Sequence, residues 1–262
     1  MAIGAVFWFV PFLTSKLKEI INKMSIIKFL KIKFENDKIF KNGDYSQMKS
    51  RVYHSVHSNI IKRKQPFIVN NHLIKSDTIS AILNQNSGKI IALNFANANI
   101  AGGGYILGGQ AQEEALCRAS LLYNTIKTAK SFYWKNRLHL LPTYTHTMIY
   151  SENVPIIRNK DGNLLDTPKL CDFITAPAVM KIFAQFIFSQ KKINKIMQER
   201  INRIIQLAAL NKPDILILGA FGCGAFGNKR EVIYPMFENA INQYIGDNVQ
   251  IIFADIVNQL QN

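Results

Sequence analysis

The stretch 94–123 constrains the fold more than any other part of the chain. An apolar run at 89–95 leads into it, and a helical pattern leaves it from Gln112 onward. Five glycines stand between the two, at Gly102, Gly103, Gly104, Gly108 and Gly109. Glycine lets a backbone turn with positive φ and approach a ligand closely. This order of strand, loop and helix therefore predicts a loop that contacts a ligand.

Two adjacent acids, Glu113 and Glu114, stand in the first turn of the expected helix. A helix N-terminus stabilises carboxylates there, because its N–H groups are free and its dipole is positive. An isolated pair of acids would need no further role. A catalytic role becomes the better interpretation only when other motifs accompany the pair.

Further motifs do accompany the acids, in a fixed order. The sequence reads NFAN at 94–97, GGG at 102–104 and QEE at 112–114. It continues as ALCRASLLY, MIYSENVPIIRNKDG, ITAPAV and LILGAFGCGAFGN, at 115–123, 148–162, 174–179 and 216–228. Over residues 40–257 this series resembles the poly(ADP-ribose) glycohydrolases, and more narrowly the microbial type of that family.

The resemblance implies roles for individual residues. Glu114 would be the catalytic acid and base, and Glu113 would hold the ribose hydroxyls beside the scissile bond. Asn97 would hydrogen-bond the same ribose. The remaining substrate-binding residues that it implies are Gly102, Gly103, Gly104, Gln112, Gly222, Cys223, Gly224, Ala225, Phe226 and Gly227. Phe221 stands where the family often has tryptophan, and Met180 where a polar residue is expected, so the adenine pocket or the packing of the loop is expected to differ from the family pattern.

The chemistry that these residues can perform is hydrolysis of a ribosyl bond. An acid protonates the departing oxygen, and a base then activates water. One glutamate can serve both steps in turn if burial or a neighbouring carboxylate raises its pKa. The resemblance implies poly(ADP-ribose) and ADP-ribosylated proteins as partners, ADP-ribose as product, and neither a metal nor another cofactor.

Alternation of strand and helix over 65–257 predicts an α/β sheet domain. Strands are expected at 65–74, 89–95, 147–150, 154–158, 170–176, 215–218 and 249–254, and helices at 78–84, 112–126, 193–210 and 230–244. A Rossmann fold is disfavoured, because neither loop reads G-x-G-x-x-G with an acid after the next strand. The resemblance implies the macrodomain fold, three α/β/α layers around a mixed sheet, with an N-terminal helical extension.

Three segments are expected along the chain. Residues 1–24 form an apolar segment, residues 25–64 an accessory extension of short helices, and residues 65–262 the macrodomain-like catalytic domain. The apolar run 2–13 is too short to span a bilayer and lacks a basic stretch ahead of it, so we expect a cytoplasmic protein without a signal peptide. Membrane or partner docking of this segment, and a true start at Met24, stay open as alternatives.

The charge balance is strongly basic, with 32 Lys and Arg against 17 Asp and Glu and a formal charge of +15. Such a field attracts polyanions without choosing among them, and no specific nucleic acid is expected. Three scattered cysteines, Cys117, Cys171 and Cys223, fit neither a disulfide framework nor a zinc site and are expected to be inert. The consecutive aromatics at 132–134 cannot all face one core, so core packing with partial exposure is expected, and ligand contact is the alternative.

Three other functions compete with the glycohydrolase. A macrodomain that only binds ADP-ribose would need its acid absent or misplaced, and the intact QEE argues against it. A hydrolase of mono-ADP-ribosylated protein would use the same residues. A basic peripheral protein would depend on the N-terminal apolar segment.

Overall fold

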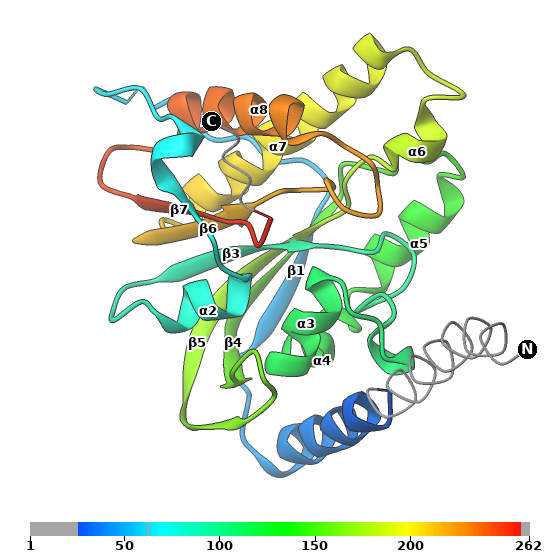
Figure 1. The fold of residues 1–262 in the computed structure, drawn as a ribbon, viewed down its shortest axis with the longest axis vertical. Helices are drawn as coiled ribbons and strands as arrows, with labels where there is room; N and C mark the ends of the chain where they lie inside the picture. The colour runs from blue at the N-terminus through cyan, green and yellow to red at the C-terminus, as the bar shows by residue number, and fades with distance from the viewer. Residues whose placement is uncertain (1–25, 62, 258–262) are drawn as a thin grey trace, which may run out of the picture.

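The computed structural model describes residues 26–61 and 63–257, so the apolar segment 1–24 lies outside it. Within this part, a seven-stranded sheet has the order β1-β4-β5-β3-β6-β7-β2 (Figure 1). The strands are β1 (Lys49–Tyr53), β2 (Leu73–Ile74), β3 (Ile90–Phe95), β4 (Met148–Arg158), β5 (Leu164–Ala176), β6 (Ile215–Gly219) and β7 (Gln250–Ala254). β4 is antiparallel to both neighbours, and the other neighbouring pairs are parallel.

Helices cover both faces of this sheet, which confirms the predicted α/β architecture with a mixed sheet. They are α2 (Thr78–Leu83), α3 (Gln112–Ala119), α4 (Leu122–Ile126), α5 (Lys130–Leu138), α6 (Lys181–Ala184), α7 (Gln190–Leu210) and α8 (Arg230–Tyr244), with 3-10 turns η1 (Val69–His72) and η2 (Tyr105–Leu107). In Figure 1, α7 and α8 lie above the sheet, and α2, α3 and α4 lie below it.

β3 lies in the middle of the sheet and is buried on both faces. Ile91 and Leu93 belong to the core that α7 and α8 cover, whereas Ile90 and Ala92 belong to the core on the opposite face. A continuous apolar run is typical of a strand covered on both sides. The glycine loop therefore leaves from the most deeply packed strand of the domain.

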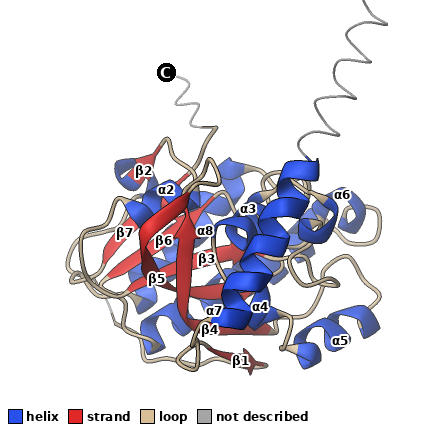
Figure 2. Ribbon diagram, turned by 90° about the horizontal axis from the view of Figure 1, so that it is seen from below, coloured by secondary structure: helices blue, strands red, loops and turns tan. Residues whose placement is uncertain are grey.

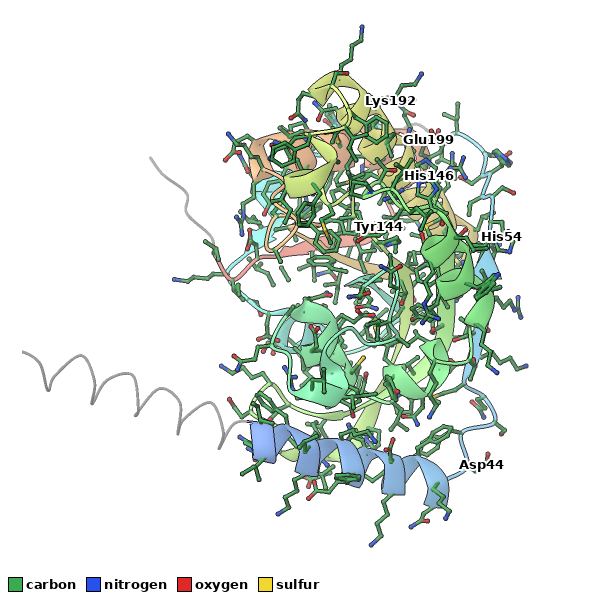
Figure 3. The ribbon with its side chains drawn as sticks, turned by 90° about the vertical axis from the view of Figure 1, so that its right-hand side faces the viewer. Asp44, His54, Tyr144, His146, Lys192 and Glu199 are labelled. Atoms are coloured by element: carbon green, nitrogen blue, oxygen red, sulfur yellow. The ribbon has the colours of Figure 1, made fainter. Side chains whose placement is uncertain are left out.

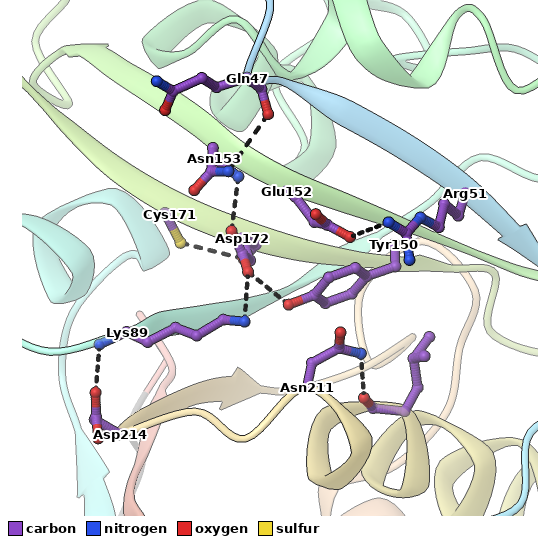
Figure 4. Close-up of polar contacts among 11 residues, drawn as sticks. Gln47, Arg51, Lys89, Tyr150, Glu152, Asn153, Cys171, Asp172, Asn211 and Asp214 are labelled. Atoms are coloured by element: carbon purple, nitrogen blue, oxygen red, sulfur yellow. Dashed lines mark hydrogen bonds and ion pairs between the residues drawn. The ribbon is translucent and has the colours of Figure 1, made fainter.

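A buried carboxylate fixes the other end of β3 (Figure 4). Asp172 is only 6% exposed and accepts hydrogen bonds from the Tyr150 hydroxyl at 2.5 Å and the Asn153 N–H at 2.7 Å. Lys89 Nζ lies 3.3 Å from its Oδ2. Because a buried charge is costly without partners, this group holds the start of β3 in register with β4 and β5.

The amphipathic helix predicted at 193–210 is confirmed as α7, and it carries a fully buried arginine. Arg200 donates hydrogen bonds to the carbonyls of Pro177 at 2.9 Å and Tyr144 at 3.2 Å. His146 Nε2 lies 3.6 Å from the Glu199 carboxylate, and Figure 3 shows Tyr144, His146 and Glu199 where this loop meets α7. α7 thus holds the loop before β4 in place.

The extension before residue 64 differs from the expected set of short helices. Residues 26–42 are helical throughout, and β1 pairs with β4 as an edge strand of the main sheet. Asn36 Nδ2 donates to the Arg118 carbonyl at 2.9 Å, so the helix of residues 26–42 packs beside α3, as Figure 2 shows. Edge pairing by β1 depends on contacts a hundred residues away, which local pattern does not reveal.

Three further boundaries were predicted wrongly. The single helix expected at 112–126 is two, because Ser120 adopts an extended backbone and its hydroxyl donates to the Leu116 carbonyl at 2.6 Å. The two strands expected at 147–158 form one, β4, with an irregularity between Ser151 and Val154. At 65–74 the strand shrinks to β2 after a 3-10 turn.

None of the helices within residues 26–61 and 63–257 combines the length and apolarity needed to cross a membrane.

Candidate active site

The first helical residue, Gln112, joins α3 to the central strand. Its Oε1 accepts a hydrogen bond from the Phe95 N–H at 2.8 Å, and its Nε2 donates to the Leu93 carbonyl at 2.8 Å. The same Nε2 lies 3.1 Å from the Thr78 hydroxyl. The amide is therefore engaged within the protein, and its main visible effect is to fix the start of α3 against β3. Its predicted contact with substrate stays a prediction.

The Glu114 side chain packs against the backbone of the first glycine loop. Its Oε1 accepts the Gly104 N–H at 2.8 Å, while its Oε2 is buried and has no partner among the described residues. A Cβ on Gly103, where φ is +54°, would stand 2.5 Å from Oε1. Only glycine therefore allows the loop to pass this close to the carboxyl. One oxygen is held, and the other is left to form a hydrogen bond with a further group.

Glu113 points to the other side of the helix start and is more deeply buried, at 2% exposure. It accepts the Asn97 N–H at 2.7 Å and the Asn94 side-chain amide at 3.3 Å. Burial is the main cause that raises the pKa of Glu113 to about 8, and the charge of Glu114 adds to it. The two hydrogen bonds act in the opposite direction and lower the pKa. The two adjacent acids thus have different surroundings, as their separation around a helix requires.

Asn97 turns the loop toward these acids. Its side-chain Oδ1 accepts the N–H groups of Asn99 at 2.9 Å and Ile100 at 3.0 Å. Its backbone N–H is bonded to Glu113. The Nδ2 group makes no hydrogen bond to other described residues, so it is the part of this side chain that a ligand can engage.

The second glycine loop runs from β6 to α8 and is held by an asparagine that sequence reasoning missed. Asn228 Nδ2 donates to the carbonyls of Val179 at 2.9 Å and Gly222 at 3.1 Å. Gly222 has a φ of +71°, and a Cβ there would meet Ala178 at 2.5 Å. Gly224, by contrast, has no atom within 4 Å of an added Cβ and faces open space. The position of Asn228 at the end of the LILGAFGCGAFGN motif was the available signal.

One cleft of about 470 Å³ joins the two glycine loops, although a hundred residues separate them in the chain. Its walls include Gln110, Ala111, Gln112 and Ala115 on one side and Gly222, Gly224, Ala225 and Phe226 on the other. The first turn of α3 thus lines the cleft through Gln112 and Ala115, whereas the carboxyls of Glu113 and Glu114, like Asn97 and the glycines 102–104, do not line it. The Phe226 ring lies 6.2 Å from that of Tyr144.

The far end of the cleft contains residues that sequence reasoning also missed. Arg230, in the first turn of α8, bonds both oxygens of Asp255 at 2.5 and 3.0 Å, and Tyr234 donates to the same carboxylate at 2.7 Å. Burial opposes ionisation, but these hydrogen bonds hold the pKa of Asp255 below its ordinary value. Ile256 and Val257 follow and line the cleft. The parallel order of β3, β6 and β7 brings these strand ends together, and no local pattern predicts it.

The cysteines and possible metal ligands do not enlarge this site. Cys117 and Cys171 are buried, and burial raises the pKa of the half-buried Cys223 to about 12, so its thiol stays protonated. No cluster of three or more His, Cys, Asp or Glu side chains in the described part of the chain is arranged to hold a metal ion.

Two adjacent acids at a helix start, beside a glycine loop of a mixed sheet, provide the groups that an α/β glycosidase needs. The family model for the catalytic domain of microbial-type PARG, poly(ADP-ribose) glycohydrolase, matches residues 19–159. The chain belongs to this family.

Solved structures agree with that assignment. PARG from Thermomonospora curvata has a TM-score of 0.74 and 23% identity over 89% of this chain and 95% of its own. PARG from Deinococcus radiodurans in complex with ADP-ribose has a TM-score of 0.65 and 33% identity over 72% of this chain and 78% of its own. The T. curvata enzyme bound to the inhibitor ADP-HPD has a TM-score of 0.74 and 22% identity over 87% and 93%. No curated protein sequence matches the chain.

Proposed function

We propose that this chain hydrolyses the ribose–ribose O-glycosidic bond of poly(ADP-ribose) and releases ADP-ribose, with Glu114 as the general acid and base. The observation that carries the proposal is the state of the Glu114 carboxyl. It is nearly buried, the Gly104 N–H holds one oxygen at 2.8 Å, and the other oxygen has no partner among the described residues. A general acid needs this combination of fixed position and one free oxygen.

In the proposed reaction, the Glu114 carboxyl donates a proton to the departing glycosidic oxygen. The bond from that oxygen to the anomeric carbon breaks, and positive charge develops on the ribose. Water then attacks the anomeric carbon and loses a proton to the Glu114 carboxylate, which restores the acid. Glu113, with its pKa raised to about 8 by burial, keeps its proton at neutral pH and can hydrogen-bond ribose hydroxyls as donor and acceptor.

The terminal ADP-ribose unit would lie along the cleft. The exposed backbone at Gly224 and the N-terminus of α8 favour a diphosphate. Phe226 would pack against the distal ribose, between the diphosphate and the acids. The apolar side chains of Ile256 and Val257 at the far end suit adenine.

Several finer assignments belong to the same proposal. We class the fold as a macrodomain and residues 65–262 as the catalytic domain, to whose sheet the extension 25–64 adds the edge strand β1, with 1–24 as a separate segment. ADP-ribosylated proteins are the expected carriers of the polymer, and the cytoplasm is the expected location. Gln112 would position α3 and, as a residue that lines the cleft, would also contact substrate.

The two nearest alternatives use the same cleft. A module that only binds ADP-ribose would not need the unpaired Oε2 of Glu114, which favours catalysis. A hydrolase of mono-ADP-ribosylated protein differs in its acceptor alone. Defined mono- and poly-ADP-ribosylated substrates compared side by side separate these two activities.

The test is release of free ADP-ribose from automodified polymerase by wild type and by Glu114→Gln. We expect the variant to lose release by several orders of magnitude and to keep its affinity for ADP-ribose. Glu152→Gln is the matched control, because Glu152 pairs with Arg51 at 3.7 Å on β4, outside the cleft. Undiminished turnover by Glu114→Gln would refute the assignment of this acid.

A further inference from the structure

A second groove lies between α5 and the loop that follows β3. Its volume is about 580 Å³. We call it the α5 groove, and its main lining residues are Ala101, Lys127, Lys130, Tyr133, Trp134 and Arg137. None of the functional assignments above uses it.

The α5 groove combines positive charge with an exposed aromatic face. Three cations line it, Lys127, Lys130 and Arg137, and no acid does. Trp134 is 62% exposed, although Phe132 and Tyr133 beside it are buried in the core. An exposed aromatic ring beside cations is typical of surfaces that bind single-stranded nucleic acid.

Two hydrogen-bonding groups strengthen the case for a ligand. The Tyr133 hydroxyl is buried and has no partner among the described residues, although the side chain is only 4% exposed and lines the groove. The Arg137 guanidinium donates from Nε at 2.9 Å and Nη2 at 2.7 Å to the Asn99 carbonyl, so it is held in place with Nη1 left over. Unpaired buried polar atoms usually meet a water or a ligand.

The α5 groove lies next to the proposed position of the terminal ADP-ribose unit. Ala101 lines it and directly precedes Gly102, and Asn99, which holds Arg137, lies two residues after Asn97. Glu114 is bonded within the same loop. The rest of the polymer is attached through the glycosidic oxygen that Glu114 protonates, so it has to leave across this loop.

We propose that the α5 groove binds the next ADP-ribose unit of the polymer, with its diphosphate on Lys130 and Arg137 and its adenine stacked on Trp134. The proposal rests on the proposed function, because it supplies the polymer's exit path. Stacking and charge recognise a repeating adenine and diphosphate without reading sequence. The groove therefore selects chains over single ADP-ribose units.

The first test is the steady-state kinetics of Trp134→Ala on purified poly(ADP-ribose). Loss of one stacked base is worth about tenfold in binding, so KM for the polymer rises about tenfold while kcat stays within twofold. Affinity for free ADP-ribose is unchanged, because it fills only the cleft. Trp134→Phe returns KM most of the way to the wild-type value. Phe34→Ala, at a residue 66% exposed on the helix of residues 26–42, leaves KM unchanged.

The second test reads Trp134 directly. The chain has two tryptophans, so Trp8→Phe leaves Trp134 as the sole reporter, and Glu114→Gln in the same chain stops turnover. Titration with poly(ADP-ribose) quenches its fluorescence, whereas ADP-ribose does not. Lys130→Glu weakens that quenching. A polyadenylate RNA that quenches equally well, together with an unchanged polymer KM in Trp134→Ala, would overturn the proposal in favour of nucleic acid.

The outcomes also separate this proposal from the proposed function. Normal release of ADP-ribose with an unchanged polymer KM in Trp134→Ala refutes the groove and leaves the enzyme standing. Quenching by polymer in a wild-type chain that releases no ADP-ribose supports the groove and refutes the enzyme.

Discussion

Replacing Glu113 by glutamine should remove a pH dependence of folding stability. The carboxyl has a pKa of about 8 in the folded protein, above its ordinary value of 4.5, because it is buried. Between those two pH values the folded state keeps a proton that the unfolded state has lost. Stability therefore falls as pH rises through this window, and above pH 8 the loss is complete.

The magnitude follows from the size of the shift. The difference between about 8 and 4.5, at about 1.4 kcal/mol per pKa unit, amounts to roughly 5 kcal/mol. For a domain of this size that corresponds to a fall in Tm of roughly 10 to 20 °C. Glu113→Gln cannot ionise, so its Tm should lack this fall.

Thermal unfolding by circular dichroism at half-unit steps from pH 4.5 to 8.5 measures the difference. The slope is compared rather than the absolute Tm, because the glutamine loses one acceptor toward Asn94. Burial lowers the pKa of His146 to about 4, which makes stability rise between pH 4 and 6.5 in both proteins and so cancels in the comparison. Parallel curves for wild type and Glu113→Gln would show that Glu113 ionises normally and refute the reasoning.

Three further substitutions test the site. Gly103→Ala puts a Cβ 2.5 Å from Glu114 Oε1 at a residue with positive φ. We expect kcat to fall more than tenfold and the free energy of unfolding to fall by only about 1 kcal/mol. An unchanged kcat would contradict the close approach of the loop to Glu114. Phe226→Ala should weaken ADP-ribose binding about tenfold by calorimetry, and equal affinity would show that the loop is misassigned. Arg118→Ala removes a hydrogen bond to the Gly109 carbonyl and should lower kcat several-fold with an unchanged Kd for ADP-ribose. If kcat and ADP-ribose affinity both fall, and Tm falls with them, the role of Arg118 is purely structural.

The sequence predicted the parts of this fold that carry a local pattern. The apolar run of β3, the stripe of α7 and the glycines at 102–104 each signal their structure within a few residues. The shared cleft was also predicted, because parallel strand ends meet at one edge of a sheet.

What the sequence did not reveal depends on distant partners. β1 is a strand because β4 is beside it, and α3 ends at Ala119 because Ser120 bonds backward to Leu116. Asn228 and Asp255 reach the site through the order of β6 and β7. The separate environments of Glu113 and Glu114 likewise require the loop in place.

Gln112 makes two hydrogen bonds to the backbone of β3, so the position of Glu114 depends on the central strand of the core. The start of α3 is therefore set by β3 rather than by the loop before it. A void opened under the central strand, however far from any sugar, would tilt the helix and misalign the carboxyl. In this enzyme, activity assays should consequently detect interior packing defects before the melting curve does.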